Sequence, residues 1–130
     1  PRDLAQALDL FPTALALAGA DAPKGVTLDG TDIGPRLFAS APLPARPFFY
    51  YRGDQLFACR LGEWKAHFKT QAGYGQAEPV LHEPPLLFHL GRDPSEKRSV
   101  AQDRADVLAQ IRSAVRAHQD GVVPGHPQLQ

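Results

Sequence analysis

Prolines and glycines interrupt this chain so often that only short secondary-structure elements can form between them. Thirteen prolines and 11 glycines stand among 130 residues. Proline lacks a backbone N–H and fixes φ, and glycine favours turns and helix ends, so clusters of the two mark turns and breaks. Such clusters fill residues 23–47 and residues 71–85. We expect an ordered connector in the first of these stretches and a long loop in the second.

After the connector, the chain contains four apolar runs of strand length, which cover residues 48–51, 55–61, 64–70 and 86–90. Gly62 and Glu63, between the second run and the third, fit a two-residue hairpin turn that opens with glycine. Along the third run, apolar side chains alternate with Lys65, His67 and Lys69, which is typical of a half-buried strand. The simplest arrangement is an antiparallel meander of four strands.

Two helices are expected, one before the strands and one after them. Residues 9–19 combine a capping acid at Asp9, Pro12 in the first turn and Gly19 as a stop. Residues 103–118 carry an apolar stripe, formed by Val107, Leu108, Ile111, Ala114 and Val115. These patterns predict an α+β fold in which a small four-stranded antiparallel sheet packs against the C-terminal helix. Since one helix covers one face of a sheet, we expect a second body on the other face.

Charge and cysteine content narrow the classes of function. Lysine and arginine total 14, as do aspartate and glutamate, which argues against a basic nucleic-acid-binding surface. No apolar segment is long enough to span a bilayer, so we expect neither a nucleic-acid nor a membrane partner. The single cysteine, Cys59, provides neither an internal disulfide nor a thiolate metal site, and it leaves the compartment undecided. The chain begins at Pro1 and has no methionine, so we interpret it as a piece of a longer protein.

Residue types that often carry catalysis are present, but not in catalytic patterns. The five histidines have no metal-ligand spacing, and the two prolines after His82 and Glu83 prevent the helix that a zinc-protease motif needs. Cys59 has no histidine or cationic cluster next to it in the sequence, so we expect an inert thiol. No serine stands in a Gly-x-Ser-x-Gly pattern. We therefore expect no catalytic residue and no metal ligand in this chain, and a self-contained hydrolase is disfavoured.

Several stretches, in order along nearly the whole chain, nevertheless resemble the late part of one enzyme family. The early ones are Asp9-Leu10-Phe11-Pro12-Thr13 and Leu28-Asp29-Gly30-Thr31-Asp32-Ile33-Gly34-Pro35. The later ones are Phe49-Tyr50-Tyr51-Arg52-Gly53-Asp54, Leu61-Gly62-Glu63-Trp64-Lys65-Ala66-His67-Phe68 and Phe88-His89-Leu90-Gly91-Arg92-Asp93-Pro94. Together they are similar to the formylglycine-dependent sulfatases of the arylsulfatase and sulfated-sugar type.

The resemblance implies a large alkaline-phosphatase-like α/β catalytic domain followed by a small C-terminal subdomain. Residues 1–46 would be the trailing helix and connector of the catalytic domain, and residues 47–130 the subdomain. In this family, Cys or Ser in the pattern Cys/Ser-x-Pro-x-Arg becomes a formylglycine nucleophile, and a calcium ion helps to hold the sulfate. The nearest match here, Ser40-Ala41-Pro42-Leu43-Pro44, has proline in place of arginine. The resemblance therefore places formylglycine and calcium in a catalytic domain outside this chain, with no cofactor within it.

The family also indicates where this chain would meet a substrate. The loop that follows Lys65-Ala66-His67-Phe68 approaches the substrate pocket in sulfatases, so Gln71, Tyr74 and His82 are candidate substrate contacts. The first hypothesis is a non-catalytic C-terminal region that packs on the catalytic domain of the same polypeptide and lines its pocket. Alone, such a piece is expected to self-associate through an exposed apolar sheet face.

A second hypothesis is a stand-alone binding module for sulfated glycans, derived from such a subdomain. It requires a cationic surface with converging donors, which the chain could build from Arg46, Arg52, Arg60, Lys65 and Lys69. The zero net charge of the chain argues against strong binding of polyanions.

Overall fold

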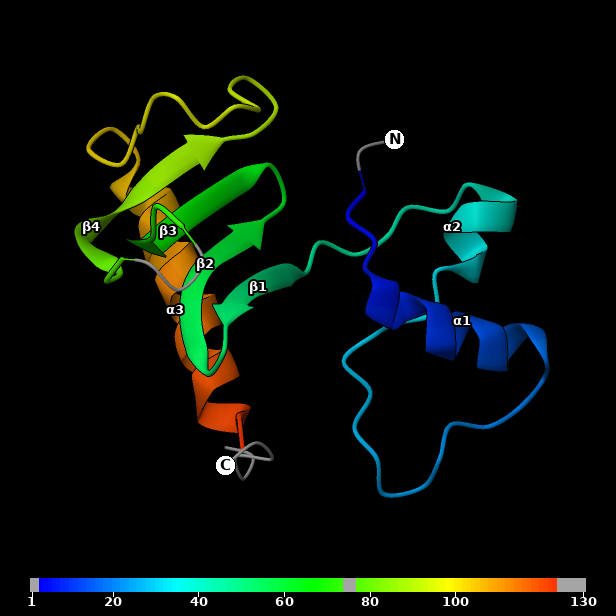
Figure 1. Ribbon diagram of the computed structural model, residues 1–130. Coiled ribbons are helices and arrows are strands. Elements are labelled where there is room, and N and C mark those ends of the chain that lie inside the picture. The colour runs from blue at the N-terminus through cyan, green and yellow to red at the C-terminus, as the bar shows by residue number, and fades with distance from the viewer. Residues whose placement is uncertain (1–2, 74–76, 124–130) are drawn as a thin grey trace. The chain divides into compact units, whose positions relative to one another are not determined.

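The computed structural model describes residues 3–73 and 77–123. The chain divides at residue 46 into Pro1–Ala45, here called unit 1, and Arg46–Gln130, here called unit 2 (Figure 1). Each unit has its own helices, and the strands all belong to unit 2. The candidate site lies in unit 2.

Unit 1 is organised around the carboxylate of Asp9. A short 3-10 helix, η1 (Ala7–Asp9), leads into α1 (Leu10–Leu17). The sequence predicts that Asp9 caps this helix, but the structure shows a different role, since its side chain makes no bond to the first turn of α1. Its oxygens instead accept the backbone N–H of Gln6 at 2.7 Å and of Thr31 at 3.0 Å. Asp9 is fully buried and ties α1 to the connector.

The connector contains a helix that the sequence analysis missed, α2 (Gly34–Ala39). We interpreted Pro35 as a turn former, yet proline fits the first turn of a helix because its missing N–H has no partner there anyway. Thr13 joins the two helices of unit 1: its hydroxyl donates to the carbonyl of Asp9 at 2.6 Å and accepts the N–H of Ile33 at 3.0 Å.

Much apolar surface of unit 1 faces solvent. Seven large apolar side chains of this unit are between 50% and 72% exposed: Leu8, Leu10, Phe11, Leu17, Val26, Leu37 and Phe38. Ile33 is the large apolar residue that unit 1 buries among its described residues. Unit 1 therefore has little core of its own.

Unit 2 is the predicted antiparallel meander, with strand order β1-β2-β3-β4. Its strands are β1 (Pro47–Arg52), β2 (Gln55–Leu61), β3 (Trp64–Thr70) and β4 (Val80–His89). Gly53 and Gly62 open the two tight turns with φ of 59°, a left-handed conformation that glycine adopts without a steric penalty. The predicted Gly62-Glu63 turn and the first three strands are confirmed.

The fourth strand begins six residues earlier than the sequence predicts. We expected a loop over residues 71–85, because prolines at 79, 84 and 85 break a regular ladder. However, β4 is the edge strand, and Pro84 and Pro85 lie where its pairing with β3 shifts register, between the partners of His67 and Lys69. An edge strand tolerates proline at such an irregularity, so this part of the predicted loop is wrong.

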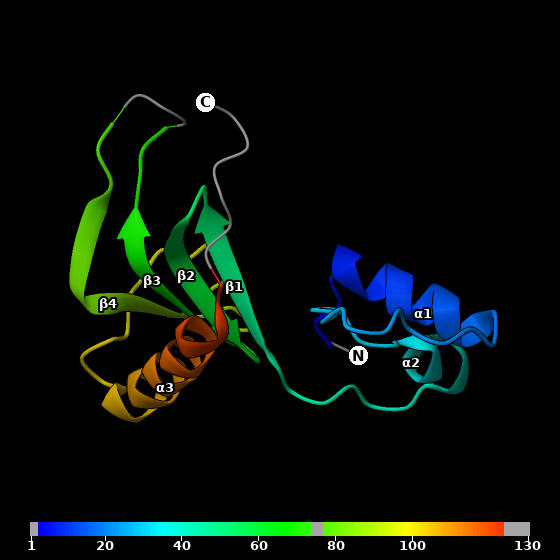
Figure 2. The same cartoon turned by 90° about the horizontal axis from the view of Figure 1, so that it is seen from below.

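The core of unit 2 lies between one face of the sheet and α3 (Ala105–Gly121), as Figure 2 shows. Cys59, Ala66 and Leu87 are neighbours across three strands and are fully buried. They pack against the predicted stripe of α3, of which Val107, Leu108, Ile111 and Val115 are buried. In the last turn of α3, the His118 ring stacks on Phe49 with centroids 3.8 Å apart.

The other face of the sheet carries both apolar and charged side chains. Lys65 and His67 stand on it, as the alternation predicts, and Phe57 and Phe88 are buried there. Cationic side chains cover part of the aromatic area, since the Arg52 guanidinium lies 5.1 Å from the Phe57 ring centroid. The segment after β4 also folds along the edge of this strand, where the Val100 N–H donates to the Leu87 carbonyl at 2.8 Å.

No helix within residues 3–73 and 77–123 has both the length and the apolar character needed to cross a membrane.

Candidate functional site

A cavity of about 330 Å³ opens on the sheet face that α3 leaves uncovered, and we call it the sheet cavity. In the register of the first three strands, Tyr50, Ala58 and His67 stand side by side at its floor. The remaining lining residues are Tyr51, Arg52, Phe57, Lys65, Lys69, Thr70 and Gln71. The cavity thus combines aromatic rings with polar and cationic side chains, as binding sites for polar ligands commonly do.

Three of the lining side chains carry a permanent positive charge, and none of the described lining residues is a carboxylate. Arg52 donates from Nη1 to the Gln71 side-chain oxygen at 2.8 Å. Lys69 donates from Nζ to the side-chain oxygen of Gln55, also at 2.8 Å. The ammonium of Lys65 lies 4.8 Å from the ring centroid of Tyr50, within the range of a cation–π interaction.

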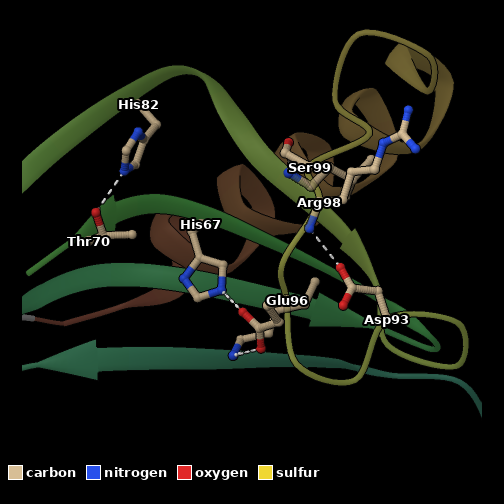
Figure 3. A network of polar contacts seen from close by, with 9 residues as sticks. His67, Thr70, His82, Asp93, Glu96, Arg98 and Ser99 are labelled. Atoms are coloured by element: carbon tan, nitrogen blue, oxygen red, sulfur yellow. Dashed lines mark hydrogen bonds and ion pairs between the residues drawn. The ribbon is translucent and has the colours of Figure 1, made fainter.

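Glu96 lies over the sheet face and contacts two lining residues of the cavity, Lys65 and His67 (Figure 3). Lys65 Nζ donates to Glu96 Oε1 at 2.7 Å, and the other carboxylate oxygen bonds to His67 Nε2. A carboxylate only accepts, so Nε2 of the imidazole is the nitrogen that carries the proton. Glu96 itself has a φ of 54°, which is uncommon for a residue with a side chain. We call Lys65, His67 and Glu96 the clasp.

The clasp holds a neutral histidine and an ionised carboxylate at pH 7. Burial lowers the pKa of His67 below its usual 6.5, and it outweighs the opposing effect of the hydrogen bond that His67 donates to Glu96. For Glu96, burial alone would raise the pKa, but the hydrogen bonds from Lys65 and His67 bring it below its usual 4.5. Glu96 therefore neutralises Lys65. The other permanently charged lining residues are Arg52 and Lys69.

The three predicted substrate contacts differ in where they lie. Gln71 lines the sheet cavity, binds Arg52 and donates to the carbonyl of Ala77. His82 does not line the cavity but bonds through Nε2 to the hydroxyl of Thr70, at 2.8 Å, and Thr70 does line it. Tyr74 lies outside the described residues.

The structure brings together part of the cationic surface considered for a glycan-binding module. Arg52, Lys65 and Lys69 share the sheet cavity, whereas Arg46 and Arg60 are not among its lining residues. Arg60 instead donates to the carbonyl of Gly62 in the β2–β3 turn, at 2.9 Å. Sequence analysis missed Glu96 because 31 residues separate it from Lys65. The only signal nearby was the Asp93-Pro94 turn.

The described lining residues of the sheet cavity include cationic hydrogen-bond donors but no cysteine or serine that could act as a nucleophile. Cys59 is buried on the opposite side of the sheet, where desolvation raises its pKa to about 12, so the predicted inert thiol is confirmed. Within the part of the chain that the structure describes, no three His, Cys, Asp or Glu side chains gather into a group that could hold a metal ion. His67, the histidine in the cavity, is engaged with Glu96.

Comparison with known sequences connects this chain with one group of enzymes. A family profile described as the C-terminal region of aryl-sulfatase matches residues 43–130. N-acetylgalactosamine-6-sulfatase from Homo sapiens is 38% identical over 97% of this chain, which corresponds to 28% of that protein. Arylsulfatase A from Homo sapiens is 37% identical over 88% of this chain and 25% of that protein. The chain therefore spans little more than a quarter of the length of these relatives.

Solved structures show the same fold. The protein described as Ps i-CgsB matches 89% of this chain with a TM-score of 0.61 and 30% identity, over 24% of its own chain. PsFucS1 sulfatase from Pseudoalteromonas sp. matches 86% of this chain with a TM-score of 0.71, over 25% of its own chain. At 24% identity, the second match bears on the fold alone.

Proposed function

We propose that this chain completes a sulfatase without cleaving sulfate esters itself. The chain belongs to the sulfatase family and corresponds to the C-terminal region of that family. The observation that carries the proposal is the family match over residues 43–130, the part of the chain that contains the sheet cavity. The Cys/Ser-x-Pro-x-Arg pattern is absent from the sequence. The nucleophile would then come from another part of the polypeptide.

The first role in this proposal is docking onto a catalytic domain. Unit 1 exposes seven large apolar side chains and buries few, which is the surface of a segment that packs against a larger body. Residues 1–46 would then form the trailing edge of the catalytic domain. Residues 47–130 would form the subdomain beside it. The docking would bury side chains such as Phe38, which is 72% exposed here.

The second role is to line one wall of the substrate pocket. The sheet cavity presents Arg52, Lys69 and Gln71, which suit an anionic or hydroxyl-bearing sugar. A relative at 38% identity is named for a sulfated sugar, N-acetylgalactosamine 6-sulfate, and we assign this chain the same class of substrate. Positioning of the sugar by this wall would assist reaction at a sulfate held by the catalytic domain.

Calcium, which the sulfatase resemblance implies, does not fit the residues of this chain. A calcium ion takes six to eight oxygen ligands, and the described residues offer no group of three suitable side chains. We therefore assign any calcium ion and the formylglycine to the catalytic domain, and no step of the reaction to this chain.

The sheet cavity is tested by titrating the chain with N-acetylgalactosamine 6-sulfate and following backbone amide shifts by NMR. We expect shifts at Gln71 and Lys69, and an affinity about tenfold weaker in Lys69→Gln, because a charge-assisted contact is lost. Lys24→Gln is the matched control, since Lys24 is an exposed lysine of unit 1. Equal affinities for the two variants would contradict a role of the cavity.

A stand-alone glycan-binding module remains the second candidate, because the structure gathers Arg52, Lys65 and Lys69 in one cavity. It differs from the first proposal in needing no catalytic domain. The module would bind the sugar equally well whether or not a catalytic domain is joined to it, whereas a pocket wall binds tightly only when the pocket is complete.

A further inference from the structure

A second cavity, of about 570 Å³, lies where β3 begins and β4 ends, and we call it the loop cavity. Its walls are Trp64 at the start of β3, His89 at the end of β4 and parts of the segment 92–104 that leads to α3. It shares no lining residue with the sheet cavity. Its volume is in the range of pockets that hold small molecules.

The loop cavity carries an excess of positive charge, although the chain as a whole is neutral. Its permanently cationic lining residues are Arg92, Lys97, Arg98 and Arg104, against the carboxylates of Asp93 and Asp103. One of these carboxylates is already engaged, because Asp93 accepts the backbone N–H of Arg98 at 2.9 Å (Figure 3). This bond and one from the N–H of Lys97 hold the pKa of Asp93 below its usual range.

Most of these cations are free to meet a ligand. Arg92, Lys97 and Arg98 make no ion pair within 4.0 Å among residues 3–73 and 77–123, although the charge of Lys97 acts on Asp93. All three side chains are exposed, so their positive charge faces solvent.

The fourth cation is held in a fixed orientation. The Arg104 guanidinium lies over the Trp64 ring, 4.7 Å from its centroid. It also donates from Nε and Nη2 to the two carboxylate oxygens of Asp106, at 3.0 and 2.9 Å. Because Asp106 neutralises this guanidinium, the cations left for an anionic ligand are those of Arg92, Lys97 and Arg98.

We propose that the loop cavity binds a sulfate group of a saccharide chain at a point separate from the sheet cavity. The presence of an anion site follows from the cations and the cavity, whereas the choice of sulfate over other anions rests on the proposed sulfatase function. A saccharide with several sulfates would meet this site with one group while another group occupies the reaction pocket. The enzyme would thereby favour oligomeric substrates over monosaccharides.

Trp64 makes the proposal directly testable, because it is the single tryptophan of the chain and lines this cavity. The full chain is titrated with a heparin-derived tetrasaccharide, and separately with inorganic sulfate, while tryptophan fluorescence is recorded. We expect a saturable change with the tetrasaccharide that weakens as salt rises. No change at millimolar tetrasaccharide, or an equal affinity for sulfate alone, would overturn the proposal.

Variants test whether the cations of the loop cavity are responsible for binding the tetrasaccharide. The double variant Arg92→Gln/Arg98→Gln removes two exposed, unpaired cations, and it should weaken the fluorescence titration by about tenfold or more. Lys24→Gln, in unit 1, should leave it unchanged. If Lys24→Gln weakens binding as much as the double variant, the attraction is non-specific and the loop cavity is no site. If the NMR titration detects no binding in the sheet cavity, a positive fluorescence titration would still support binding in the loop cavity.

Discussion

Gly30 has no room for a side chain, because a Cβ there would lie 2.0 Å from the carbonyl oxygen of Leu8. We predict that Gly30→Ala destabilises unit 1 by roughly 2–4 kcal/mol, since backbone must move to relieve the clash. Limited proteolysis should show faster cleavage within residues 1–45 and unchanged cleavage of unit 2. Gly73→Ala is the control, as nothing lies within 4 Å of its Cβ. If the protease cleaves the Gly30→Ala variant and the native chain at the same rate, residue 30 does not lie as close to the Leu8 carbonyl as described.

Cys59 is fully buried, and its pKa is raised to about 12. A thiol reagent attacks the thiolate, so we predict no measurable reaction of the folded chain with Ellman's reagent at pH 8. Complete reaction should follow in guanidinium chloride, which exposes the thiol. Rapid labelling of the folded chain would show that the core between the sheet and α3 is open.

At the scale of elements, the packing of α3 against the sheet depends on Ile111, whose side chain is fully buried in the core cluster. Ile111→Ala should lower the stability of unit 2 by about 2–5 kcal/mol, because it removes buried area and leaves a cavity. Gln110→Ala, at the exposed neighbouring position, should change it by less than about 0.5 kcal/mol. Thermal unfolding followed by circular dichroism measures both, and a loss in Ile111→Ala no larger than in the control would contradict this packing.

The clasp links the segment after β4 to β3 and should make unit 2 sensitive to acid. The pKa values of His67 and Glu96 are both lowered in the folded state, so the unfolded chain takes up these protons first as pH falls. Stability should fall below about pH 6.5 through His67, and again below about pH 4.5 through Glu96. In the variant His67→Gln, the loss of stability that His67 causes below about pH 6.5 should be absent. Melting temperatures of both proteins from pH 8 to 4 test this, and parallel curves would show that His67 does not cause it.

Sequence patterns predicted the elements that local chemistry specifies. The alternation around Lys65 and the stripe of α3 around Ile111 led directly to the sheet, the helix and the face on which each side chain lies. The early start of β4 and the helix α2 were missed because proline was interpreted as a break, although an edge strand and a first helical turn accept it. The position of Glu96 could not be predicted, since it lies in the segment after β4 and its partners, Lys65 and His67, lie far away in the sequence, on β3.

At the scale of the whole molecule, the exposed apolar side chains of unit 1 should drive association in the absence of a docking partner. We predict concentration-dependent self-association in sedimentation velocity runs. The variant Leu37→Ser/Phe38→Ser, which removes two of these exposed apolar side chains, should shift the chain toward monomer. A monomer at every concentration would argue against the proposal that this surface belongs to an interface.

The central claim is that this chain completes a catalytic domain in the same polypeptide. The most direct measurement is to sequence the coding DNA upstream of Pro1. The account predicts an open reading frame that continues upstream and encodes the pattern Cys/Ser-x-Pro-x-Arg. A start codon directly before Pro1, with no such pattern in frame, would contradict it and would favour a free-standing binding module.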